Sequence, residues 1–223
     1  GVGGDGRSPV IFDADGRILD QLLGLTARND FEGASRIELS SGTQIIEAAI
    51  LINGSCFDGI ADERSPCELR GLDELRALLL HEAGHFCNLD HSALNHEMAD
   101  DGDPANNAAL PTMYPVHTED DASLAVLNMD DRLAMSSLYP RSPFPGSGGG
   151  IEGRVLGPAF TPLDGANVTV RNMEDPFLLA ATRISGAEVS AGYYRFAGLP
   201  PGNYTVEVAP FPSAFVGRFS VGQ

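Results

Sequence analysis

The sequence contains no lysine and no tryptophan, and it has only three cysteines. All 14 basic side chains are therefore arginine, and the 31 acidic ones give a formal net charge of −17. A chain this acidic is not expected to bind nucleic acid or an anionic membrane, because both partners need a basic face. No run of about 18 apolar residues is present, so we expect no transmembrane segment. With 43% hydrophobic residues, the 223-residue chain is nevertheless expected to fold.

The charge is distributed unevenly along the chain. Residues 1–145 hold 25 acidic and 9 basic side chains, whereas residues 146–223 hold 6 and 5. The change falls at SPFPGSGGG, which has the proline, glycine and serine composition of a linker. We therefore predict a first domain over residues 1–141, a linker over 142–150 and a second domain over 151–223.

The hydrophobic pattern predicts mixed secondary structure before the linker and strands after it. The elements expected before the linker are strands over residues 10–12 and 43–53 and helices over residues 72–87 and about 129–139. Apolar residues at spacings of three to four indicate the first helix, and Asn128 is suited to cap the second. Short alternating runs after the linker predict strands over residues 167–171, 193–196 and 204–208.

The segment HEAGHFCNLDH carries the chemistry of the chain. His81 and His85 are four residues apart, so one helix face presents two imidazoles that can share a metal ion. Glu82 is placed to reach a metal-activated water without binding the metal. His91 can join the same metal only if the helix ends and the chain turns sharply. Asn88 suits that turn because asparagine tolerates the left-handed conformation.

Three landmarks in this part of the chain resemble the metzincin clan of zinc peptidases. The spacing of the three histidines is similar to HExxHxxGxxH, with Asn88 in place of glycine, and Asp90-His91-Ser92 resembles the matrixin branch. PTMYP, which contains Met113, resembles the Met-turn, and the helix that ends near Tyr139 is similar to the closing helix of matrixin domains. The resemblance implies an α+β zincin (metzincin) catalytic domain with a mixed sheet and an active-site helix.

The resemblance also implies a zinc-dependent endopeptidase that acts on proteins or peptides. His81, His85 and His91 would hold a catalytic Zn²⁺, which keeps one coordination position open. Glu82 would be the general base for the metal-activated water, and Met113 would form a packed floor beneath the ligands. Two alternatives stay open: a zinc site without catalysis, and an inactive surface adhesion or scaffold protein that binds through its second domain.

In metzincins an extended substrate pairs with an edge strand of the sheet. By position, residues 47–52 would form this edge here, so Ala49 and Ile50 are expected to contact substrate. The residues expected to form the wall of the specificity pocket are Pro115, Val116 and His117.

Other residues have weaker interpretations. Cys56 and Cys67 flank a short polar loop, which suits either a disulfide or two thiols. A disulfide would indicate a secreted or cell-surface protein, which we expect to be bacterial and monomeric.

Asp13, Asp15 and Asp20 form either a Ca²⁺ site or a polar turn. The polar turn is favoured because their spacing does not fit an EF-hand loop.

The sequence after the linker resembles a second family. GRVLGPAFTPLDGANVTV and GYYRFAGLPPGNYTVEV are similar to the carboxypeptidase regulatory-like domain and its Cna-B relatives. The resemblance implies an all-β prealbumin-like sandwich that acts as a spacer or binding module. Cna-B domains often carry a Lys–Asn isopeptide bond, which the absence of lysine excludes here.

Overall fold

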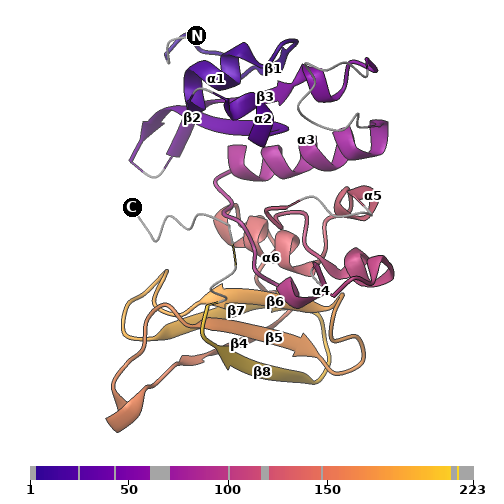
Figure 1. Ribbon diagram of the computed structural model, residues 1–223. Coiled ribbons are helices and arrows are strands. Elements are labelled where there is room, and N and C mark those ends of the chain that lie inside the picture. Colours follow the sequence, from indigo (N-terminus) through magenta and orange to yellow (C-terminus); the bar gives the residue numbers. More distant parts are fainter. Residues whose placement is uncertain are drawn as a thin grey trace. The chain divides into compact units, whose positions relative to one another are not determined.

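The computed structural model forms two compact units, residues 1–89 and 90–223 (Figure 1). The residues that the structure describes are 4–24, 26–42, 44–60, 71–99, 101–116, 121–146, 148–211 and 215. The division at residues 89 and 90 rests on compactness alone, so the domain boundaries predicted from sequence stay a prediction.

The first unit combines helices with a mixed three-stranded sheet. Its elements are β1 (Val10–Asp13), α1 (Arg17–Leu23), α2 (Ala27–Asp30), β2 (Gly33–Ser41), β3 (Gln44–Asn53), the 3-10 helix η1 (Gly54–Cys56) and α3 (Leu72–Phe86). The strand order is β1-β3-β2, with β1 parallel and β2 antiparallel to β3. The expected strands at residues 10–12 and 43–53 and the helix at 72–87 are confirmed to within a residue or two, whereas α1, α2 and β2 were not foreseen.

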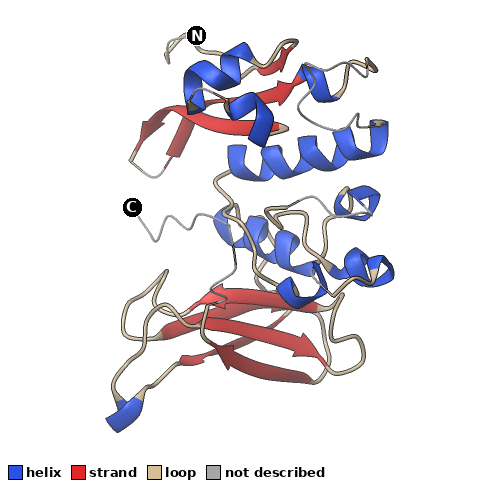
Figure 2. Ribbon diagram, in the orientation of Figure 1, coloured by secondary structure: helices blue, strands red, loops and turns tan. Residues whose placement is uncertain are grey.

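From Glu47 onward strand β3 is buried on both faces, which explains the apolar run AAILI. Because side chains alternate across a strand, Leu51 packs with Leu19 of α1 on one face, while Ile50 and Ile52 pack with Leu78 of α3 on the other. Helices therefore lie on both faces of the sheet (Figure 2). This packing fixes α3 against the strand that precedes it.

The expectation that residues 47–52 form a sheet edge is wrong. Ile50 is paired with Val10 of β1 on one side and with Ser35 of β2 on the other. Ala49 and Ile50 are also buried. Among the described strands, β2 is the antiparallel edge strand. Position before the active-site helix suggested the edge, whereas the apolar sequence of β3 reflects a strand with a neighbour on each side and a helix on each face.

The second unit contains two sheets around one core. Its elements are α4 (His96–Ala99), η2 (Pro104–Ala109), α5 (Asp121–Leu124), α6 (Met129–Leu138), β4 (Gly149–Arg154), η3 (Pro158–Phe160), β5 (Asn167–Asn172), β6 (Ala180–Ile184), β7 (Tyr193–Leu199) and β8 (Tyr204–Ala209). One sheet pairs β4 with β7, and the other has the order β6-β5-β8. The strand pairs described in this unit are all antiparallel.

Helix α6 belongs to the same core as the strands that follow it. Met129 and Leu133 pack in one cluster with Val168, Val170 and Phe196. The helix contacts β6 and β7, beside which it runs in Figure 1. Its predicted cap is confirmed, because the Asn128 side chain accepts hydrogen bonds from the first-turn N–H groups. The segment predicted to be the last helix of the first domain is thus built into the β-sandwich core.

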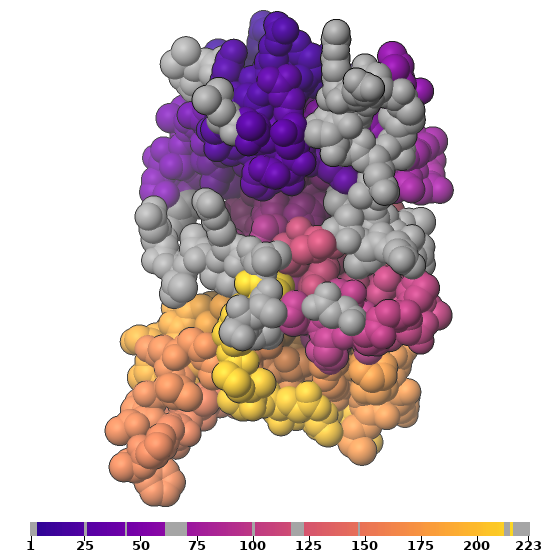
Figure 3. Space-filling view, viewed as in Figure 1, coloured from indigo at the N-terminus to yellow at the C-terminus, as the bar shows by residue number. Residues whose placement is uncertain are grey.

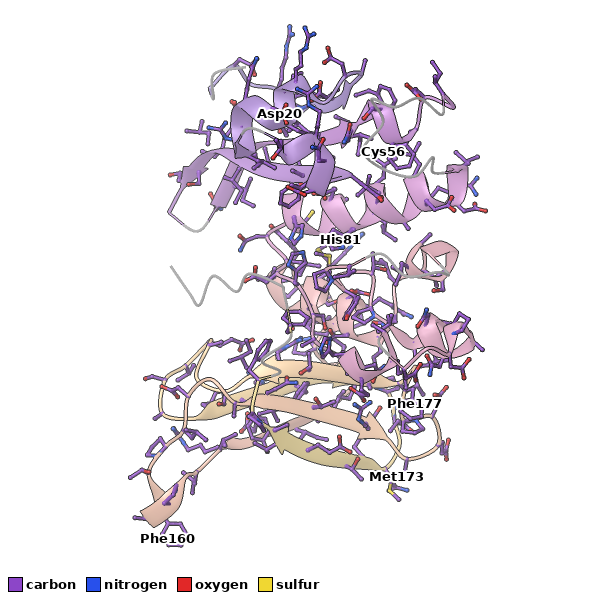
Figure 4. All side chains as sticks on the ribbon, viewed as in Figure 1. Asp20, Cys56, His81, Phe160, Met173 and Phe177 are labelled. Carbon is purple, nitrogen blue, oxygen red and sulfur yellow. The ribbon has the colours of Figure 1, made fainter. Side chains whose placement is uncertain are left out.

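A short arm projects from the second unit near η3 (Figure 3). Phe160, labelled in Figure 4, is 84% exposed at its tip. Across the described part of the chain, no helix is long and apolar enough to cross a membrane.

Candidate metal centre

Helix α3 carries the first two histidines of the predicted site. Its first turn is stabilised by Glu74, whose carboxylate accepts a hydrogen bond from the Gly71 N–H (2.9 Å). Leu75, Leu78 and Leu79 pack on the strand-facing side. The helix is therefore anchored through its apolar face, independently of the histidines.

The helix ends at the turn that the sequence predicts. Asn88 has a φ of 68°, in the left-handed region, as expected for the residue in the glycine position. The Asn88 N–H donates to the His85 carbonyl (2.8 Å), and the Leu89 N–H donates to the Gly84 carbonyl (2.9 Å). This pair of bonds is the Schellman motif, which closes the last turn of the helix and reverses the chain. This reversal is needed to bring His91 back towards His81 and His85.

The three histidines converge on one point. His81, His85 and His91 each offer a ring nitrogen, and these nitrogens lie within 4.8 Å of one another. The Nε2 atoms of His81 and His85 (His81 is labelled in Figure 4) are 3.1 Å apart. Two nitrogen ligands of a tetrahedral zinc lie about 3.3 Å apart when each is about 2.0 Å from the metal. The spacing of His81 and His85 therefore fits two ligands of one zinc ion, and His91 lies near enough to offer a third imidazole.

The orientation of His85 is set by the turn itself. Its Nδ1 lies 2.8 Å from the Leu89 carbonyl oxygen. A carbonyl only accepts, so Nδ1 carries the proton and Nε2 keeps the lone pair that a metal needs. Glu82, the residue after His81, is buried. Its main-chain carbonyl accepts a hydrogen bond from the Ser35 hydroxyl of β2 (2.7 Å).

The predicted Met-turn forms a tight turn. The Tyr114 N–H donates to the Pro111 carbonyl (2.9 Å), and Met113 is buried. The Met113 carbonyl accepts a hydrogen bond from the N–H of Ser92, the residue after His91 (2.9 Å). The turn is therefore tied directly to the segment that carries the third histidine.

Asp131 of α6 holds the other side of this turn. Its carboxylate accepts hydrogen bonds from the N–H groups of Thr112 (3.0 Å), Met113 (3.1 Å) and Asn128 (3.1 Å). Burial, and next to it the charge of Asp130, raises the pKa of Asp131 to about 6. The sequence suggested only that this aspartate favours a helix start.

The three aspartates proposed for calcium have other partners. Asp13 accepts a hydrogen bond from the Leu19 N–H, Asp15 pairs with Arg17, and Asp20 pairs with Arg28. In the part of the chain that the structure describes, these carboxylates do not gather into a group of metal-ligand geometry.

Some predicted residues fall outside the described chain. Cys67 and His117 are among them, so the disulfide and part of the specificity wall stay predictions. Cys56 is fully buried, Pro115 is half-buried and Val116 is exposed. Cys87 is a reduced thiol, and burial raises its pKa.

The comparisons with known proteins identify the C-terminal part. Residues 150–213 match the family described as the carboxypeptidase regulatory-like domain. This match spans β4 to β8 and confirms the resemblance inferred for that segment. Comparison of the chain with curated proteins found no match. The C-terminal strands therefore form a carboxypeptidase regulatory-like β domain within a chain of mixed helices and sheets.

Two features near the histidines were missed from the sequence. Strand β2 was overlooked because GASRIELSS is largely exposed and lacks a clean alternation. The long-range partners of the segment after His91 were overlooked because polar side chains give no periodic signal. An Asp-Asp pair at a helix start is the one hint that the sequence offered.

Proposed function

We propose that the chain is a zinc-dependent peptide hydrolase. The observation that carries the proposal is the convergence of three histidine ring nitrogens, two on α3 and one after its terminal turn. An isolated helical histidine pair would not need the left-handed Asn88 or the tie between Ser92 and Met113. The metzincin-like spacing of these residues supports the same reaction class.

In this proposal, different residues bind the metal and transfer the proton. His81, His85 and His91 would hold the zinc ion. When bound, zinc supplies a Lewis acid that acidifies a water molecule and polarises the scissile carbonyl. Glu82 accepts a proton from the attacking water and returns it to the leaving amine, so it acts first as base and then as acid.

Strand β2 is the segment best suited to align an extended substrate. It lies at the edge of the described sheet, so a peptide can add to it by main-chain hydrogen bonds. Ser35 of β2 is bonded to the main chain of Glu82, which ties this edge to the helix that bears the proposed base. Substrate specificity would then be set by side chains along β2 rather than by Ala49 and Ile50.

The alternative is an inactive adhesion or scaffold protein. The match of residues 150–213 to a regulatory-like domain fits this alternative, because a spacer or binding module is what that resemblance implies. The site of the proposed activity lies outside the matched residues. Zinc analysis together with hydrolysis of a quenched peptide library, with and without chelator, separates the two functions.

Glu82→Gln tests the proposed mechanism. We expect the variant to keep zinc and to lose activity by a factor on the order of 10² to 10⁴, because the proton acceptor is gone. Glu188→Gln, in an exposed loop, is the matched control and should leave the rate unchanged. Hydrolysis by Glu82→Gln at the wild-type rate would contradict the role of Glu82.

A further inference from the structure

The segment that carries the third histidine, residues 91–96, is bound at two points to the regulatory-like domain. We call this segment the His91 loop. It lies in the second unit together with α6 and strands β5 and β6. Its sequence, HSALNH, has no helical or strand periodicity that would fix its shape locally. Its position must therefore come from long-range bonds.

The first tether runs through Asp130 of α6. The Asp130 carboxylate accepts a hydrogen bond from the Ser92 hydroxyl (2.6 Å) through one oxygen. Its other oxygen accepts from the Thr182 N–H of β6 (2.9 Å) and lies 3.6 Å from the Arg183 guanidinium. One buried carboxylate thus joins the residue after His91 to the main chain of β6.

The second tether runs through Arg171 of β5. Its guanidinium donates to the side-chain oxygen of Asn95 (2.6 Å) and to the Pro176 carbonyl (3.0 Å). The Asn95 side chain in turn donates to the carbonyls of Ala109 (2.7 Å) and Phe177 (3.2 Å; Phe177 is labelled in Figure 4). Asn95 is therefore held by Arg171 of β5, by Ala109 of η2 and by the loop that follows β5.

Both tethers are buried, which makes them costly to break. Asp130 and Asn95 are 4% and 1% exposed. A buried polar group that loses its partner pays its full desolvation cost, and a charged one pays more. The His91 loop therefore has little freedom to move while the domain stays folded.

We propose that the regulatory-like domain is a positioning element of the metal site. Arg171 and the Thr182 main chain hold the His91 loop, directly or through Asp130, in the place where His91 completes the ligand set. Asp130 and Arg171 are positioning residues, since neither belongs to the histidine cluster. The inference rests on the proposed zinc site, but the tethers themselves can be tested without metal.

The test compares three substitutions in the full chain. Asp130→Ala removes the first tether and Arg171→Met removes the second. Arg195→Met is the matched control, because Arg195 is an exposed arginine of β7 paired only loosely with Glu152 (3.9 Å). Asp130→Asn serves as the conservative variant, since an amide can still accept from Thr182 and can donate to the Ser92 hydroxyl.

Two readouts are recorded for each protein. Hydrogen exchange of the metal-free chain measures the protection of residues 91–99. Titration with Co²⁺ alone measures metal affinity and the visible spectrum of the bound ion. We expect Asp130→Ala and Arg171→Met to lose protection in this segment and to bind Co²⁺ about tenfold or more weakly with an altered spectrum. Arg195→Met should match the wild type, and Asp130→Asn should recover most of the affinity.

The outcomes separate this inference from the proposed function. If the wild type binds Co²⁺ and both tether variants keep its affinity, spectrum and exchange protection, the positioning role is overturned. If the wild type binds no Co²⁺, the zinc site fails, and exchange of residues 91–99 still decides whether the tethers hold the loop. Should Asp130→Ala fail to fold, Arg171→Met and the conservative variant decide the matter.

Discussion

The two halves of the candidate site are held in place by different means. His81 and His85 lie on one helix and before its terminal turn, whose main-chain hydrogen bonds join residues close in sequence, and the helix packs on β3 through its apolar face. His91 is followed by a loop whose bonds reach to Met113, to Asp130 and, through it, to Thr182. The first half is built locally and the second is built by the tertiary fold. They should therefore respond differently to substitution.

Removing a ligand from either half gives the largest expected effect. We expect His85→Ala and His91→Ala each to weaken zinc binding by more than about 100-fold, since each removes one of three ligands. Arg195→Met is the control, because Arg195 is exposed on β7 and lies outside both the histidine cluster and the His91 loop. Competition with a chelating dye measures the affinities. An unchanged zinc affinity in His91→Ala would show that His91 is not a ligand.

Asp131→Asn should disturb only the tertiary half. An amide has one acceptor oxygen, so it cannot accept all three N–H groups that Asp131 binds. We expect a loss of roughly 3 kcal/mol in the free energy of unfolding, measured by urea denaturation. Hydrogen exchange should rise in residues 111–116 and remain unchanged in α3. Faster exchange in α3 would show that the two halves are not independent.

The ionisation of Asp131 should also make the free energy of unfolding depend on pH, which is a smaller effect. The raised pKa of Asp131 means that its protonated form is favoured in the folded state. This preference adds fully to the free energy of unfolding below pH 3.8, the ordinary pKa, and the added stability is lost as the pH rises through about 6. The amount by which the unfolding free energy of the wild type exceeds that of Asp131→Asn should therefore decrease by at most about 3 kcal/mol between pH 3.5 and 7. A gap that widens over this range would contradict the raised pKa.

Asn88 gives the smallest expected effect, confined to the local half. Its φ of 68° suits glycine better than asparagine and suits alanine worse than either. We expect Asn88→Gly to change the unfolding free energy by less than about 1 kcal/mol and Asn88→Ala to lower it by about 1 kcal/mol. Thermal unfolding of both variants checks the order. Greater stability in Asn88→Ala would mean that the turn is not held in the left-handed conformation.

The same contrast explains what the sequence could and could not predict. The helix, its end at Asn88 and the histidine spacing follow from local periodicity and turn chemistry, and they were predicted. The edge strand β2 and the partners of Asp130 and Arg171 depend on residues that are distant in sequence. A single sequence carries no record of such pairings, because many polar side chains could make them. The apolar run of β3 was read correctly as a strand but placed wrongly in the sheet for the same reason.

The central claim is that His81, His85 and His91 bind one zinc ion. A crystal structure of the zinc-loaded chain, with an anomalous difference map recorded at the zinc edge, tests this most directly. We predict one strong peak about 2.0–2.1 Å from a ring nitrogen of each histidine. A zinc-loaded crystal whose strongest peak lies away from these three rings, or which has no zinc peak, would contradict the account.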